Sequence, residues 1–60
     1  MNILDLPIDG VGIGPGGTRY RVLRDVEERL PRLGLVTVRV TEDQVGNIHK
    51  FIRGIEIEPA

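Results

Sequence analysis

Residues 18–41 read TRYRVLRDVEERLPRLGLVTVRVT, and this stretch decides the fold. Its second part, Leu35–Thr41, carries valines at alternate positions, with Thr37, Arg39 and Thr41 between them. β-Branched residues repeating with a period of two strongly favour an extended chain with one apolar face. We therefore predict a strand at 35–41.

The first part of the same stretch indicates an amphipathic helix. Its apolar residues follow one another at spacings of one, three, four and three, as on one face of a helix: Val22, Leu23, Val26, Leu30 and Leu33. Thr18 suits the N-cap, and Gly34 suits the left-handed residue that ends a helix. Pro31 opposes a straight helix because it lacks a backbone donor. We predict a helix at 18–33, kinked or ending early near Leu30.

The flanking segments extend this pattern in both directions. Apolar and polar residues alternate at 3–8, which predicts a first strand. Thr41-Glu42-Asp43-Gln44 has the spacing of a capping box and predicts a short helix at 42–52. Ile55 and Ile57 alternate with glutamates and predict a last strand at 55–58. The order β-α-β-α-β predicts an α/β layer with right-handed crossovers.

Size and composition point to help from another chain. Sixty residues make one small domain, 1–60, whose core must be aliphatic because the chain has one Tyr, one Phe and no Trp. With no Cys and one His, neither a disulfide nor a zinc site can be built. We therefore expect a protein partner or a homo-oligomer to complete the sheet, and no metal or cofactor.

Net charge and hydropathy restrict the partners further. The formal charge of −1 offers no general attraction to nucleic acid or to an anionic membrane. No apolar run is long enough for a transmembrane helix, and no basic and apolar leader opens the chain. We expect a cytoplasmic protein that binds neither nucleic acid nor membrane.

A glycine-rich segment, GVGIGPGG at 10–17, precedes the arginines. Its simplest interpretation is a flexible connection between strand and helix. Gly12, Gly14 and Gly17 match the G-x-G-x-x-G dinucleotide pattern, but no acidic residue stands where one would bind a ribose. Alternatively, the segment binds an anion at the N-terminus of the predicted helix. The residues of this hypothetical site are Gly14, Gly16, Gly17, Thr18, Arg19 and Arg21.

The Gly14-Pro15-Gly16-Gly17 motif also resembles a known family. It lies where small thioredoxin-like proteins of the redox-active-disulfide type carry Cys-Pro-x-Cys, and Glu58-Pro59-Ala60 looks like the family's cis-proline segment. The resemblance implies a thioredoxin-like N-terminal half. Because glycines replace both cysteines, thiol-disulfide chemistry is lost, and a docking surface with Pro15 and Pro59 would remain.

The remaining polar residues do not suggest catalysis. We expect His49 to be exposed near the end of the second helix and Tyr20 to lie at the rim of the core. Asp5, Asp9, Glu56 and Glu58 are expected to form a solvated acidic edge rather than an acid-base pair, because so short a chain forms no deep pocket. The sequence therefore predicts a protein that is not an enzyme and has no catalytic residue. It favours a redox-inactive, thioredoxin-like interaction module, such as a small subunit or assembly factor, with a small anion-binding domain as the alternative.

Overall fold

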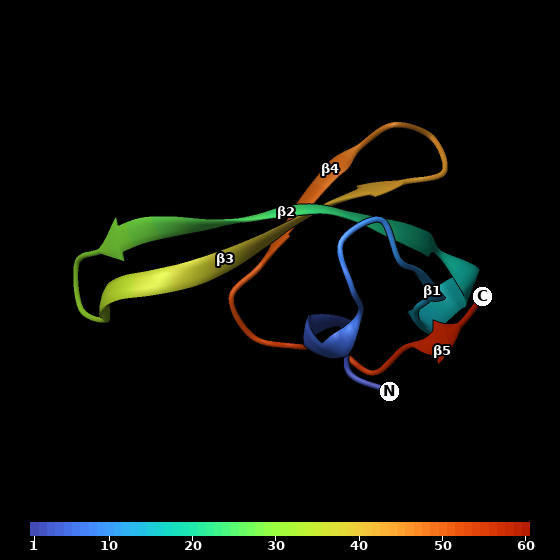
Figure 1. The fold of residues 1–60 in the computed structure, drawn as a ribbon, viewed down its shortest axis with the longest axis horizontal. Coiled ribbons are helices and arrows are strands. Elements are labelled where there is room, and N and C mark those ends of the chain that lie inside the picture. Colours follow the sequence, from blue (N-terminus) through green and yellow to red (C-terminus); the bar gives the residue numbers. More distant parts are fainter.

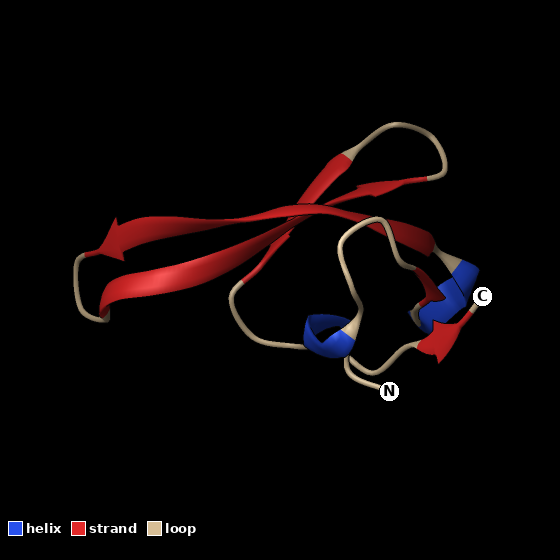
Figure 2. Cartoon of the chain, in the orientation of Figure 1, coloured by secondary structure: helices blue, strands red, loops and turns tan.

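The computed structural model describes residues 1–60, which form a single antiparallel sheet (Figure 1). Its five strands are β1 (Val11–Ile13), β2 (Arg19–Leu30), β3 (Gly34–Asp43), β4 (Ile48–Phe51) and β5 (Glu58–Pro59). The strand order is β4-β3-β2-β1-β5, so the first four strands form a meander and β5 returns to pair with β1. The only helical segments are two 3-10 turns, η1 (Ile3–Asp5) and η2 (Pro15–Gly17) (Figure 2).

The predicted α/β layer is therefore wrong, and so is the thioredoxin-like resemblance, which requires helices against the sheet. The segment 18–33, predicted to be a helix, forms β2 and the turn after it, and 42–52 forms the β3–β4 hairpin. Residues 3–8 contain η1 in place of a strand. The strand predicted at 35–41 is confirmed by β3, whereas at 55–58 only a bridge at Glu56 and the start of β5 are extended.

A β-bulge in β2 explains why this strand has a helix-like pattern. Val22 lies opposite Thr41, but Arg24 lies opposite Val40, so Leu23 is an extra residue in β2. An extra residue moves every later side chain to the other face of the sheet. Val22 therefore faces the core, while Val26 and later even-numbered residues face the opposite side. Because the bulge interrupts the period of two, the apolar residues of β2 mimic a helical stripe.

Two left-handed glycines close the hairpins. Gly34, with φ of 73°, ends the turn between β2 and β3, so its left-handed conformation is confirmed although no helix precedes it. Gly46, with φ of 88°, lies in the turn between β3 and β4. There the Asp43 carboxylate accepts hydrogen bonds from the backbone N–H groups of Val45 and Asn47, at 3.0 and 2.9 Å. The predicted capping box is thus an Asx turn.

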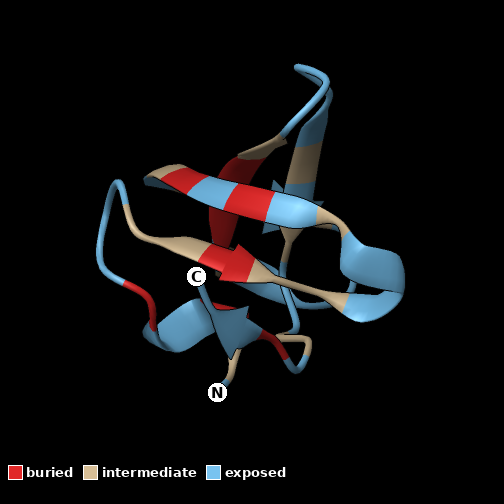
Figure 3. Cartoon of the chain, turned by 90° about the vertical axis from the view of Figure 1, so that its right-hand side faces the viewer, coloured by how far each residue is buried: buried red, intermediate tan, exposed pale blue.

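The core lies on one face of the sheet and joins both ends of the chain. Its buried side chains are Ile3, Leu6, Tyr20, Val22 and Ile57, with Phe51 and Ile55 packed against them. β2 alternates between exposed and buried residues over its first four residues, from Arg19 to Val22 (Figure 3). The Ile3 N–H donates to Ile55 O, and the Ile57 N–H donates to Met1 O. The first and last segments therefore close the core together.

No helix in this structure combines the length and the apolar character that crossing a membrane requires.

Candidate functional site

The distal part of the β2–β3 hairpin, residues 26–38, projects from the body of the molecule, and we call it the arm. In the view of Figure 1 it extends to the left, away from both chain ends. β1 pairs with β2 only at residues 19–21, and β4 pairs with β3 only at 39–42. The arm is therefore a two-stranded ribbon without neighbouring strands. Such a ribbon is at best marginally stable in water by itself.

The two faces of the arm differ in chemistry. One face carries Val26, Leu30, Val36 and Val38, with Glu28 among them. Lys50 of β4 reaches Glu28 at 3.4 Å, and this ion pair crosses β3 at Val38, which is only 1% exposed. The alkyl stems of the charged side chains thus cover the valines.

The opposite face and the tip of the arm are exposed. Glu27 lies opposite Thr37, and Arg29 lies opposite Leu35. Neither Glu27 nor Arg29 forms an ion pair within the chain. Leu35 is 61% exposed, and Leu33 in the turn is 62% exposed. Both leucines thus place exposed apolar surface at the tip of the arm.

The free edge of β3 offers backbone hydrogen-bonding groups. The Asp43 N–H donates to Asn47 O, so the backbone of Asp43 points toward β4. Because backbone groups alternate in direction along a strand, the N–H and C=O groups of Thr37 and Leu35 point to the same edge of β3 as those of Asp43. These two residues lie beyond the end of β4. There they form none of the backbone hydrogen bonds that link turns and loops. The segment 34–38 is therefore an unpaired edge.

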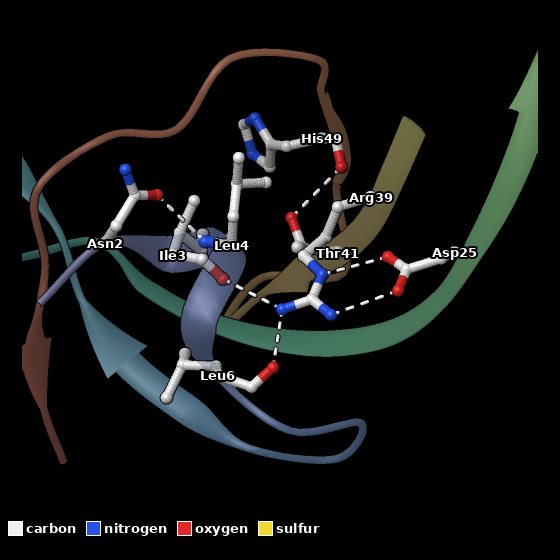
Figure 4. Close-up of polar contacts among 8 residues, drawn as sticks. All are labelled: Asn2, Ile3, Leu4, Leu6, Asp25, Arg39, Thr41 and His49. Carbon is white, nitrogen blue, oxygen red and sulfur yellow. Dashed lines mark hydrogen bonds and ion pairs between the residues drawn. The ribbon is translucent and has the colours of Figure 1, made fainter. Parts of the chain in front are cut away.

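A buried arginine fixes the base of the arm to the rest of the protein (Figure 4). Arg39 is 8% exposed, and its Nε and Nη2 donate to the two carboxylate oxygens of Asp25 at 2.9 and 3.1 Å. Its Nη1 donates to the carbonyl oxygens of Ile3, at 3.0 Å, and of Leu6. Arg39 thus joins η1 to β2 and β3 where the arm begins. A bidentate pair of this kind fixes geometry as well as adding energy.

The same contacts shift the proton affinities of the pair. The hydrogen bonds from Arg39 hold the pKa of Asp25 below its ordinary value of 3.8. The bond to Asp25 raises the pKa of Arg39 in turn. Both residues are therefore charged at neutral pH.

The residues predicted to bind an anion occupy a different structure from the one expected. Gly14, Pro15, Gly16 and Gly17 form the tight connection between β1 and β2, in which the Gly14 N–H donates to Thr18 O at 2.8 Å. No helix begins after them. The site therefore lacks the helix N-terminus on which the prediction depended.

The two arginines of that prediction lie on the outer face of β2. Arg19 and Arg21 line a shallow depression of about 230 Å³ together with Val11, Glu42, Asp43 and Gln44. Arg21 pairs with Glu42 at 3.2 Å, and Gln44 Oε1 accepts a hydrogen bond from the Arg19 N–H. Two carboxylates in the same depression oppose an anion, so only the Arg19 side chain remains free to bind one.

The other predicted positions are scattered. Pro15 is in η2 and Pro59 is in β5, where it pairs with Gly12, and no peptide bond in the chain is cis. The expected acidic edge is not formed: its members lie in η1 (Asp5), in the following turn (Asp9), at an isolated bridge (Glu56) and in β5 (Glu58).

His49 and Tyr20 belong to the core side of the sheet. His49 Nε2 is 2.8 Å from Asp43 Oδ2, and its ring meets Tyr20 edge to face at 5.3 Å. The contact with His49 and the hydrogen bonds of the turn hold the pKa of Asp43 below its ordinary value. Tyr20 also meets Phe51 edge to face. The group supports the β3–β4 turn and has no nucleophile beside it, so it does not form a catalytic site.

Comparisons of the chain with protein-family models, with curated proteins and with solved structures found no match. The candidate site therefore depends on the structure alone.

Sequence reasoning missed the residues that matter most in the arm. Leu33 and Leu35 were assigned to a helix face and to a strand, and neither was singled out as exposed. Arg39 lies, as expected, on the strand face opposite the valines, but its contacts with η1 and Asp25 were not foreseen. One signal was available: Pro31 and Gly34 three residues apart, between β-branched and alternating segments, are typical of a hairpin turn.

Proposed function

We propose that this protein is an interaction module that binds other polypeptide chains by adding a strand to the free edge of β3. One observation carries the proposal: the edge at 34–38 is unpaired and uncharged, with exposed Leu35 within it and exposed Leu33 beside it. An extended chain placed there would bond to the backbone of β3, and its alternate side chains would meet the two faces of the arm.

The other free edge of the arm is a poorer site. Residues 24–30 of β2 read RDVEERL, with five charged side chains in seven positions. Charged residues on an edge strand discourage pairing with another chain. The segment 34–38, GLVTV, carries no charge and no proline. The β3 edge is thus the one that accepts a partner strand.

A selection from displayed random peptides tests this function. Selected peptides should shift the backbone amide resonances of Leu35 and Thr37 and slow their hydrogen exchange, because these N–H groups would become bonded. Thr37→Pro removes one outward N–H without disturbing the β2–β3 bonds, and it should abolish binding.

A matched control is available on the opposite edge. Glu28 lies opposite Val36, whose backbone N–H and C=O point toward β2. Backbone groups alternate along a strand, so the N–H and C=O of Glu27 point away from β3, toward the free edge of β2. Glu27→Pro therefore removes an equivalent N–H from the other edge and should leave peptide binding intact. Peptides that shift resonances elsewhere, or a selection that enriches none, would contradict strand addition at β3.

Binding of a small anion is the second candidate function. Its support is the Arg19 guanidinium, which forms no ion pair and lies beside Arg21 in the outer depression. If it is correct, millimolar phosphate or sulfate raises the melting temperature and shifts the amides of residues 14–19. Arg19→Ala should then weaken phosphate binding by about 1.5–3 kcal/mol, the range for hydrogen bonds to charged groups. Titration without either effect would remove this candidate.

A further inference from the structure

We infer that the strand accepted by the β3 edge is the β3 of a second copy of this chain, paired antiparallel about a two-fold axis at Val36. This inference rests on the function proposed above and specifies the partner. The two copies would join their arms into one four-stranded sheet, β2-β3-β3-β2. Each arm would then lose its free β3 edge.

The backbone of the edge is self-complementary in this register. With Val36 opposite Val36, Leu35 of each copy lies opposite Thr37 of the other. These are the residues whose N–H and C=O groups point outward, so each Leu35–Thr37 pair can exchange both backbone hydrogen bonds. Centring the axis on Val38 would instead bring the second copy against β4, which already occupies the edge from Arg39 onward.

The charges on the exposed face favour the same register. Arg29 lies beside Leu35 and Glu27 lies beside Thr37. Pairing about Val36 therefore produces two rows of side chains across the four-stranded sheet. Each row begins at Arg29 of one copy and ends at Glu27 of the other. At about 4.8 Å between strands the two backbones are about 14 Å apart, a span that extended arginine and glutamate side chains cross.

If the two-fold axis is moved by one residue along β3, the row of side chains that passes through the axis has like charges at its two ends. An axis at Leu35 sets Arg29 against Arg29, and an axis at Thr37 sets Glu27 against Glu27. Like charges across a sheet oppose pairing. Since neither side chain has a partner within the chain, both are free to serve this purpose.

The exposed leucine of the tip also finds an apolar neighbour in the dimer. The turn residue 33 of one copy would lie beside the end of β4 of the other copy, where Ile52 leaves the sheet. Ile52 and Leu4 border an open depression beside Thr37 and Arg39. Both are exposed large apolar side chains, as is Leu33. The contact would cover apolar surface that the single chain leaves in water.

Sedimentation velocity from low micromolar to near-millimolar protein tests the inference. So short an interface predicts a weak dimer, with a Kd in the micromolar range or above. Thr37→Pro should weaken association about tenfold or more, whereas Glu27→Pro, which removes an N–H from the other edge, should weaken it no more than Glu27→Ala, which removes only the charge. The amides of Leu35 and Thr37 in the wild-type chain should gain exchange protection as the protein concentration rises.

Charge reversal tests the register itself. Glu27→Arg alone and Arg29→Glu alone should each weaken the homodimer by about threefold to tenfold, because each makes both rows repulsive. An equimolar mixture of the two variants should associate as tightly as the wild type, since its rows again join opposite charges. The exposed positions of both residues leave the fold of each variant unchanged.

Three results would overturn the inference. They are a chain that stays monomeric at every concentration, a dimer that Thr37→Pro leaves intact, and a variant mixture that associates no better than its components. Each would leave the proposed function open to its own test, because the peptide selection examines the edge without requiring a second copy. If the dimer is confirmed but the peptide selection enriches no peptide, the β3 edge pairs only with a second copy of this chain.

Discussion

Removal of the Asp25 carboxylate should destabilise the protein through its effect on Arg39. In the Asp25→Ala variant the guanidinium keeps its bonds to the carbonyls of Ile3 and Leu6 but loses both carboxylate contacts. Because Arg39 is 8% exposed, water cannot fully replace the lost partner. The positive charge is left buried without a counterion.

The magnitude follows from the burial of the pair. Breaking a fully buried ion pair by removing one partner costs about 3–5 kcal/mol. The Asp25 side chain is 38% exposed, so solvent screens the pair, and two carbonyls remain bonded to Arg39. We therefore expect a loss of about 2–3 kcal/mol. A 60-residue chain has a total stability of about 3–9 kcal/mol, so the loss is a large fraction of it.

Urea denaturation followed by circular dichroism measures the loss, with Glu27→Ala as the matched control. Glu27 is an exposed acid two residues away with no ion-pair partner, and its removal should change stability by less than about 0.5 kcal/mol. If Asp25→Ala costs no more than Glu27→Ala, the Asp25–Arg39 pair does not stabilise the fold.

The dependence on pH supplies a second check. The pKa of Asp25 is lowered in the folded state, so its contribution is fully present above the unfolded value near 3.8 and is lost as pH falls through the folded value. The difference between wild type and Asp25→Ala should therefore shrink below pH 3.8. A difference that stays constant to the lowest accessible pH would refute the assignment.

Three further substitutions test the turns and the close packing of β1. Asp43→Ala removes the carboxylate that bonds the β3–β4 turn, so thermal melts should show a lower melting temperature and the turn amides should exchange faster. Gly34→Val places a β-branched residue at a φ of 73° and should cost about 1–3 kcal/mol in chemical denaturation. Gly12→Ala puts a methyl group against Ile57 and should cost about 1–3 kcal/mol by the same assay, whereas an unchanged midpoint would show that Ile57 repacks freely.

The parts of the fold that the sequence predicts are those in which local pattern and tertiary position agree. β3 is rich in β-branched residues, and within 35–41 its valines alternate strictly with polar residues. It also keeps one register with β2 from Arg24 onward, so no bulge interrupts this alternation. The strand is therefore recognisable from the sequence. Gly34 is similar, because any chain reversal there needs a left-handed residue. Such signals depend on the residue itself more than on its neighbours in space.

β2 could not be assigned from the same kind of pattern. The bulge at Leu23 exchanges the two faces of the strand halfway along, and only the pairing with β3 reveals it. The segment RDVEERL is rich in the good helix formers arginine, glutamate and leucine, yet its pairing with β3 overrides this propensity. Pro31, in the hairpin turn, is the local signal that contradicts a helix in this segment.

The candidate site was harder to predict than the fold. An unpaired edge is a property of the sheet, since the backbone edge at 34–38 is free only because β4 ends at Phe51, opposite Arg39. The glycine-rich segment attracted attention through its composition, yet it forms a compact connection between two strands. The apolar residues of the arm were visible in the sequence, but an amphipathic helix would have buried them.

The closure of the core by both chain ends has a consequence for the order of events during folding. The β2–β3 and β3–β4 hairpins join residues close in sequence and can form early, whereas Ile3 meets Ile55 across almost the whole chain. During translation the hairpins therefore emerge before the segment that seals the core. Folding of this unit is completed only after Ile57 has been synthesised, and a nascent chain stalled before that residue would display the arm with no sealed core beneath it.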